Sequence, residues 1–82
     1  MDILIYSRPG CMGCRAAKRM LDKRDTPYTE IDIDSPEAED VRNSGATSLP
    51  VIHLKDDQDE VVEEHSGFSP EKITHMIDTM NK

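Results

Sequence analysis

The sequence predicts an α/β fold, a mixed four-stranded sheet flanked by three helices in the order β-α-β-α-β-β-α, and two observations lead to it. Short apolar runs alternate along the chain with segments of helical periodicity, as in βαβ units. The helix-start signal Ser-Pro-Glu occurs twice, at Ser35–Glu37 and Ser69–Glu71. Because a βαβ crossover is right-handed, helices should cover both faces of the sheet. The chain has no linker or repeat, so residues 1–82 should form one domain.

The first strand and the first helix are expected within residues 2–24. Asp2–Tyr6 is nearly all apolar, as in a strand that is covered on both faces. Residues 12 to about 24 should be helical, because Cys14, Ala17 and Leu21 recur at the spacing of one buried helix face. Cys14 should therefore point toward the core.

The next two elements differ in their pattern. Tyr28–Ile33 alternates apolar and polar residues, which predicts a half-exposed strand. The helix that follows should have Ser35 as its N-cap and Pro36 at its first position, and it should end at Gly45.

The last third of the chain predicts a hairpin and a helix. Pro50 should open a third strand, Val51–Leu54, which a turn at Lys55–Asp59 connects to a fourth strand, Glu60–Glu64. The last helix should begin at the second Ser-Pro-Glu signal. Its apolar stripe is formed by Ile73, Met76, Ile77 and Met80.

The two cysteines of the chain form a Cys-x-x-Cys motif where the first strand is followed by the first helix. A thiol at a helix N-terminus lies near unpaired N–H groups and the positive end of the helix dipole, which favour the thiolate. Cys11 should therefore be the exposed, attacking cysteine. Cys14 lies one helical turn away on the inward face and should resolve a mixed disulfide. The motif predicts a redox-active dithiol.

Other roles for the cysteine pair have less support. A structural disulfide would close a loop of only four residues and would constrain the unfolded chain little. A closed zinc site needs four ligands, and His53, His65 and His75 are scattered without ligand spacing. His65 should be a surface residue.

The charge pattern restricts the partners. A net charge of -7 argues against binding nucleic acid. No apolar stretch could span a membrane and no signal peptide precedes the first strand, so we expect a cytoplasmic protein, and its two cysteines suit a reducing compartment. Residues 8–24 nevertheless carry six of the ten basic residues. This local positive charge could attract an acidic partner, with Arg8 and Arg15 as the strongest candidates.

Three segments resemble the thioredoxin/glutaredoxin family, and the resemblance spans essentially the whole chain. They are Cys11–Cys14, Thr47–Val51 and Ser66–Pro70. The resemblance implies a thioredoxin fold with Cys11 and Cys14 as the catalytic residues and a cis Leu49–Pro50 bond that faces them. Within the family the chain closely resembles the NrdH-redoxins, although His65 and Ser69 replace the tryptophan and arginine usual there.

NrdH-redoxins are reduced by thioredoxin reductase and pass electrons to class Ib ribonucleotide reductase. The resemblance therefore implies a monomeric thiol–disulfide oxidoreductase without a bound cofactor or metal, supplied with electrons from NADPH through a reductase. The expected partner-binding residues are Arg8, Met12, Leu49, Pro50, Ser66, Gly67 and Phe68. For Gly67 a turn with positive φ, and for Phe68 a place in the core, remain alternatives.

Three other functions stay open. A glutaredoxin or mycoredoxin would be regenerated by a low-molecular-weight thiol, but the Cys-Pro-Tyr-Cys motif and the Gly-Gly pair of glutathione-binding members are missing. An iron–sulfur module would join two chains through Cys11. A non-catalytic adaptor would not need an intact dithiol.

Overall fold

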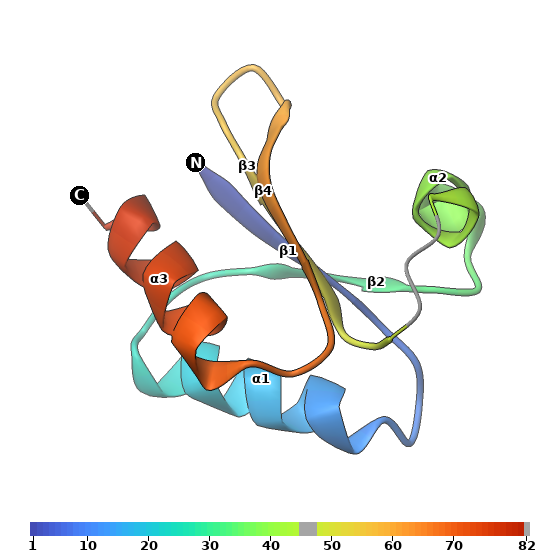
Figure 1. The fold of residues 1–82 in the computed structure, drawn as a ribbon, viewed down its shortest axis with the longest axis horizontal. Helices are drawn as coiled ribbons and strands as arrows, with labels where there is room; N and C mark the ends of the chain where they lie inside the picture. Colours follow the sequence, from blue (N-terminus) through green and yellow to red (C-terminus); the bar gives the residue numbers. More distant parts are fainter. Residues whose placement is uncertain (45–47, 82) are drawn as a thin grey trace.

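The chain folds into a four-stranded mixed sheet with helices on both faces, in a computed structural model that describes residues 1–44 and 48–81 (Figure 1). The strands lie in the order β2-β1-β3-β4. Their bounds are Asp2–Ser7 (β1), Thr29–Asp32 (β2), Val51–Lys55 (β3) and Val61–Ser66 (β4). The helices are α1 (Met12–Lys23), the 3-10 helix η1 (Pro36–Ala38), α2 (Glu39–Asn43) and α3 (Pro70–Met80). The predicted order of elements is confirmed, with the second helix divided into η1 and α2.

The sheet register brings three distant segments to one end of the sheet. β1 is parallel to β2 and antiparallel to β3, so Tyr6 lies opposite Val51. β3 is antiparallel to β4, which places Val51 opposite Ser66. The end of β1, the start of β3 and the end of β4 are therefore neighbours. The segments that continue from them, including the cysteine motif and Pro50, meet at this end.

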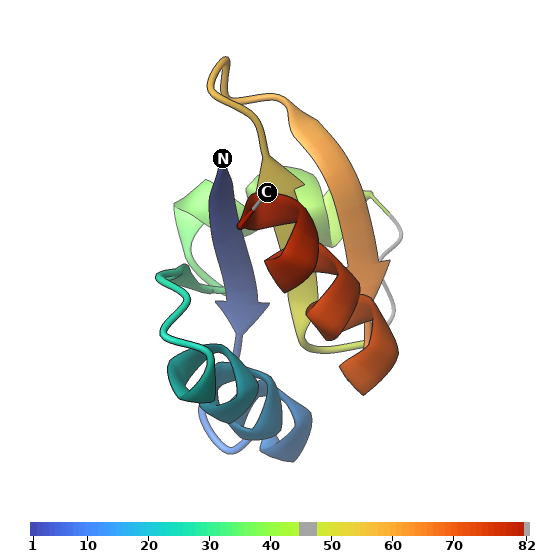
Figure 2. The same cartoon turned by 90° about the vertical axis from the view of Figure 1, so that its left-hand side faces the viewer.

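Two apolar clusters hold the helices to the two faces. Figure 1 shows α2 on the side of the sheet opposite α1 and α3. Figure 2, turned by 90°, shows α3 in front of the sheet. The cluster beneath α1 and α3 includes Ile5, Leu21 and Ile77, and the cluster beneath α2 includes Tyr6 and Val41. Burial of each large aliphatic side chain contributes about 1.5–3 kcal/mol, so these clusters explain why the periodic positions of α1 and α3 predict their buried faces.

Several predicted boundaries differ from those in the structure, most of them by one residue, and the second helix and the end of β4 differ more. A continuous second helix was expected, but a 3-10 turn precedes a short α-helix that ends at Asn43; the predicted stop at Gly45 lies outside the described residues. Ser35 occupies the N-cap position, yet its hydroxyl donates to the carbonyl of Asp32 at 2.7 Å and caps no helical N–H. Serine competes for local backbone groups in this way. β4 also extends to Ser66, because Ser66 pairs with Val51.

Within the described part of the chain, no helix is long and apolar enough to cross a membrane.

Candidate active site

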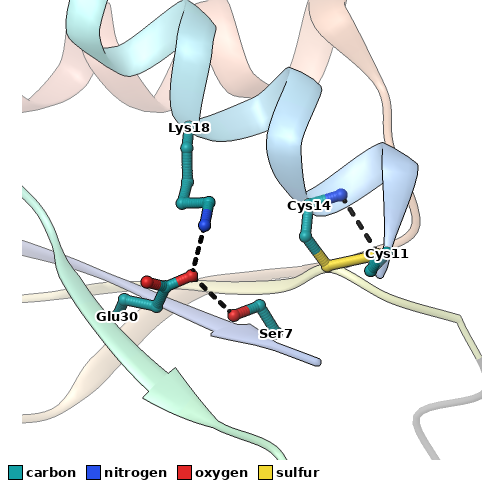
Figure 3. Close-up of a disulfide and its surroundings, with 5 residues drawn as sticks. All are labelled: Ser7, Cys11, Cys14, Lys18 and Glu30. Atoms are coloured by element: carbon teal, nitrogen blue, oxygen red, sulfur yellow. Dashed lines mark hydrogen bonds and ion pairs between the residues drawn. A yellow bond between two sulfur atoms is a disulfide. The ribbon is translucent and has the colours of Figure 1, made fainter. Parts of the chain in front are cut away.

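Cys11 and Cys14 form a disulfide at the N-terminus of α1 (Figure 3). Their Cα atoms are 5.3 Å apart. Cys11 is the N-cap residue, with extended backbone angles of φ -78° and ψ 112°, and its Sγ accepts a hydrogen bond from the N–H of Cys14 at 3.1 Å. An N–H that donates to sulfur at a helix N-terminus stabilises a negative charge on that sulfur. The position therefore suits a Cys11 thiolate in the reduced protein.

The two cysteines differ in their access to solvent. Cys14 is 1% exposed and lies on the buried face of α1 with Ala17 and Leu21. Cys11 is partly exposed at the open end of the helix. The predicted burial of the pair is thus confirmed, and a partner could approach Cys11 more easily than Cys14.

Pro50 lies beside the cysteine motif, as the resemblance implied. The Leu49–Pro50 peptide bond is cis. Pro50 is buried, and its carbonyl accepts a hydrogen bond from the N–H of Gly67 at 2.9 Å. Gly67 has a φ of +83°, so the turn role considered for this glycine is confirmed.

Gly13, between the two cysteines, allows the close packing of this region. A Cβ atom on Gly13 would lie 3.3 Å from Cβ of Phe68, 3.4 Å from Cδ of Pro50 and 3.5 Å from the carbonyl oxygen of Leu49. Gly13 was not among the residues predicted for the site. The signal was a glycine inside a predicted helix, where it costs about 1 kcal/mol relative to alanine and often marks a close approach of another segment.

An apolar rim lies beside the cysteine motif. It consists of Met12, Leu49 and Phe68. Met12 is 76% exposed, Phe68 is 41% exposed, and Leu49 is partly buried. A core role for Phe68 is therefore wrong, because nearly half of the residue is open to solvent. Exposed large apolar side chains that gather beside a reactive group are typical of a docking surface.

The two arginines proposed as functional lie in different environments. Arg8 donates to Asp34 through Nε at 3.3 Å and Nη2 at 3.1 Å, so a carboxylate offsets its charge. Arg15 is exposed and makes no ion pair within residues 1–44 and 48–81. The sequence suggested equal roles for the two, but Arg15 keeps the freer positive charge.

A polar group that was not predicted from the sequence lies to one side of the disulfide (Figure 3). Oε2 of Glu30 accepts hydrogen bonds from Nζ of Lys18 at 2.6 Å and from the hydroxyl of Ser7 at 2.8 Å. These two hydrogen bonds hold the pKa of Glu30 below its ordinary value. The bond from Lys18 has the larger effect and the bond from Ser7 the smaller one. The alternating pattern of residues 28–33 predicted only that the carboxylate of Glu30 faces solvent. The contact between Lys18 and Glu30 could not be predicted, because it forms only when α1 packs beside β2.

A cavity of about 510 Å³ connects this polar group with the cysteines. Its lining includes Cys11, Cys14, Arg15, Lys18 and Glu30. It is large enough for part of a peptide chain or a small molecule. The cavity thus gives solvent a path toward the cysteine pair on the side facing β2.

The histidines take no part in the cysteine site. Nε2 of His65 lies 3.5 Å from Oε2 of Glu63, and Nε2 of His75 lies 2.9 Å from the other carboxylate oxygen of Glu63. His65 was predicted at the surface, but its side chain is only 22% exposed and its Nε2 atom is buried. Among the residues that the structure describes, no three His, Cys, Asp or Glu side chains are grouped so that they could hold a metal ion.

Known proteins share both the sequence and the fold. A sequence model of the glutaredoxin family matches residues 3–58. The glutaredoxin-like protein NrdH of Salmonella typhimurium is 33% identical over 81 residues, which cover 96% of this chain and 93% of the relative. The NrdH protein of Escherichia coli strain K12 is 36% identical over 78 residues, covering 93% of this chain and 89% of the relative.

Solved structures agree with these matches. The glutaredoxin-like NrdH-redoxin of Escherichia coli, described as having a thioredoxin-like activity profile, superposes with a TM-score of 0.76 at 36% identity. The match covers 92% of this chain and 93% of that one. Thioredoxin f2 of Chlamydomonas reinhardtii superposes with a TM-score of 0.73 at 15% identity, over 96% of this chain and 77% of that one. The thioredoxin fold is therefore confirmed.

Proposed function

Since the chain belongs to the glutaredoxin family, and within it to the NrdH-redoxins, we propose that it is a dithiol–disulfide oxidoreductase that carries electrons between proteins. The arrangement of the cysteine pair carries the proposal. Cys11 is accessible at a helix N-terminus and its Sγ accepts the N–H of Cys14, while Cys14 is buried behind it. Cys14 is therefore placed to attack Sγ of Cys11 and not a substrate disulfide in solvent.

The proposed cycle transfers two electrons in two exchange steps. The Cys11 thiolate attacks one sulfur of a substrate disulfide, forms a mixed disulfide and releases the other substrate sulfur as a thiolate. Cys14, after losing its proton, attacks Sγ of Cys11, breaks the mixed disulfide and releases the second substrate thiolate. The substrate is reduced, and the Cys11–Cys14 disulfide is the oxidised product.

The rim would bind the protein that exchanges electrons with the dithiol. Met12 and Phe68 offer exposed apolar area, and Leu49 and Pro50 lie against the cysteine motif. Ser66 and Gly67 would hold the turn that presents Phe68. A protein partner contacts such a surface over many residues, whereas a small thiol needs a few well-placed polar groups. The rim therefore favours a protein as the electron donor.

Thioredoxin reductase, with electrons from NADPH, is the proposed donor, and class Ib ribonucleotide reductase or another disulfide-containing protein is the proposed acceptor. The kinship with NrdH proteins supports this assignment, as does the thioredoxin-like activity profile described for the Escherichia coli relative. The carrier would need no bound cofactor, would act as a monomer, and would stay reduced in a cytoplasm.

A reductant-exchange experiment tests the proposal. The oxidised protein is supplied with NADPH and either thioredoxin reductase or glutathione plus glutathione reductase, and reduction of a protein disulfide is followed. We expect rapid turnover with thioredoxin reductase and slow turnover with glutathione. Cys11→Ser is the control, because it should abolish turnover with both donors.

The opposite order of rates would assign the protein to the glutaredoxins that use a small thiol. Failure with both donors, together with iron and visible colour in protein purified without oxygen, would favour the iron–sulfur alternative instead. Each outcome therefore identifies a different function.

A further inference from the structure

An exposed basic face runs along α1 from the cysteine motif. We define the α1 basic face as Arg15, Arg19 and Lys23, which are spaced four residues apart and share the solvent side of the helix. None of the three makes an ion pair with the described residues. Arg15 follows Cys14 directly, so the face begins at the dithiol.

Three neighbouring basic residues, in contrast, form ion pairs with acidic residues. Arg8 pairs with Asp34, Lys18 with Glu30, and Arg24 with Asp78. These three ion pairs offset the charges that the sequence places around the cysteines. The positive charge left on α1 therefore belongs to the α1 basic face.

The opposite end of the sheet is acidic. Residues 56–60 of the β3–β4 hairpin contain four acids and no base. Asp2, at the start of β1, pairs with Lys55, whereas Tyr6, near its end, pairs with Val51 beside the active site. The acidic hairpin therefore lies at the end of the sheet away from the dithiol. Positive charge is therefore concentrated near the dithiol, and negative charge at the opposite end of the sheet.

Two hollows extend from the disulfide along α1. The cavity of about 510 Å³ is lined by both cysteines, Arg15, Lys18 and Glu30. A second hollow, of about 350 Å³, is lined by Arg15, Lys18 and Glu30 as well, and also by Arg19, Asp22 and Tyr28. The shared residues make the two hollows adjoin. Together they form a groove between α1 and β2 that leads from the cysteine pair to the α1 basic face.

We propose that this groove and the α1 basic face bind an acidic segment next to the disulfide of the protein substrate. This inference rests on the proposed function and adds the chemical class of its substrate. Two arginines on one face can each hold a carboxylate through paired N–H donors. Because the groove begins at the cysteine pair, residues that flank the disulfide attacked by Cys11 would lie in it.

The charge separation supports an acidic occupant over a basic one. A protein of net charge -7 repels an acidic partner at long range. Near the α1 basic face, the local positive charge attracts the same partner. An acidic segment would thus approach in the orientation that presents its disulfide to Cys11. A basic segment would be drawn toward the hairpin, away from the dithiol. Such complementarity acts mainly on the rate of encounter and on specificity.

Matched peptide substrates provide the test. Two peptides of equal length, each with one intramolecular disulfide, carry either four glutamates or four lysines beside it. A third substrate, bis(2-hydroxyethyl) disulfide, is neutral and reports the chemistry of the dithiol alone. At low ionic strength we expect kcat/KM for the acidic peptide to exceed that for the basic peptide on the order of tenfold. The ratio should fall toward one as salt is added.

Two double variants locate the effect. Arg19→Gln with Lys23→Gln removes two of the three charges of the α1 basic face and leaves Arg15 beside Cys14 in place, and Arg24→Gln with Lys55→Gln removes two charges elsewhere. Both have the same net charge. We expect the first variant to lose most of the preference for the acidic peptide, through a higher KM, and to keep its rate with the neutral disulfide. The second variant should retain the preference.

The outcomes separate the two proposals. Equal rates with both peptides, or a preference for the basic one, would overturn the acidic-substrate inference and leave the oxidoreductase function intact. An equal loss of preference in both double variants would assign the effect to net charge and overturn the site. If the protein reduced none of the three disulfides, the proposed function would fail, and this inference with it.

Discussion

Gly13 packs directly against Phe68, so that a Cβ atom on the glycine would lie 3.3 Å from Cβ of the phenylalanine. This contact joins the first turn of α1 to the turn after β4, two segments that are far apart in sequence. Most Cβ atoms keep a greater distance from such neighbours, so a side chain at position 13 would require Phe68 or Pro50 to shift by a few tenths of an ångström. The position of the rim thus depends on a glycine between the cysteines.

The first prediction is that Gly13→Ala and Phe68→Ala are coupled. Substitutions of residues in contact are commonly non-additive by about 0.5–3 kcal/mol. Gly13→Ala should move Phe68 and raise KM for the reductase, and it should have little further effect once the phenyl ring is absent. A double-mutant cycle on kcat/KM measures the coupling. Strict additivity would show that the packing has no role in docking.

The second prediction concerns Phe68 alone. Phe68→Ala should raise KM for the reductase on the order of tenfold, because an exposed aromatic residue beside the site would act as a binding anchor. Alkylation of Cys11 by iodoacetamide should be nearly unchanged. Val62→Ala is the matched control, since Val62 is similarly exposed on β4. A similar rise in KM for both variants would contradict a specific role for Phe68.

The third prediction separates the roles of the cysteines. Cys14→Ser should accumulate a mixed disulfide with protein substrates, because the resolving thiol is absent. Cys11→Ser should form none, because Cys14 is buried. Mass spectrometry under non-reducing conditions measures both adducts. Full turnover by Cys14→Ser would replace this cycle with a monothiol mechanism.

The fourth prediction concerns pH and Glu30. Hydrogen bonds from Lys18 and Ser7 lower the pKa of Glu30 in the folded protein. The resulting stability is present above the pKa of an unfolded glutamate and is lost as pH falls through the lowered folded value. Because the Lys18–Glu30 pair is partly exposed, its contribution should stay below about 1 kcal/mol.

Urea unfolding of the wild type and of Glu30→Gln, at neutral and at acid pH, tests this prediction. The variant should be less stable at neutral pH, and the difference should shrink as pH falls. Asp22→Asn, which changes an exposed acid on α1 without a described ion pair, is the control. A difference that is the same at both pH values would argue against the ionised form of Glu30 as its source.

Sequence patterns predicted much of this molecule because they act over short distances along the chain. The spacing of Cys14, Ala17 and Leu21 places them on one face of a helix in any fold, and all three are buried. The position of Cys11 before that helix makes it the N-cap. Such features depend on the backbone period and on the helix terminus, both of which are local.

Prediction was weaker where local signals competed. Ser35 and Pro36 predicted a capped α-helix, but the serine hydroxyl bonds the carbonyl of Asp32 and the first turn is a 3-10 helix. A serine hydroxyl can donate to a nearby carbonyl or accept a helical N–H, and the sequence alone does not show which of these local partners comes within reach.

By itself the sequence determined the order of elements, the inward face of α1 and the placement of the dithiol at a helix end. Only the tertiary structure decided that Arg8 meets Asp34, that Glu30 joins Lys18, and that Gly13 meets Phe68. Each of these contacts joins residues on different elements. Their formation depends on sheet register and helix packing, which follow from burying the whole apolar core at once rather than from any local pattern.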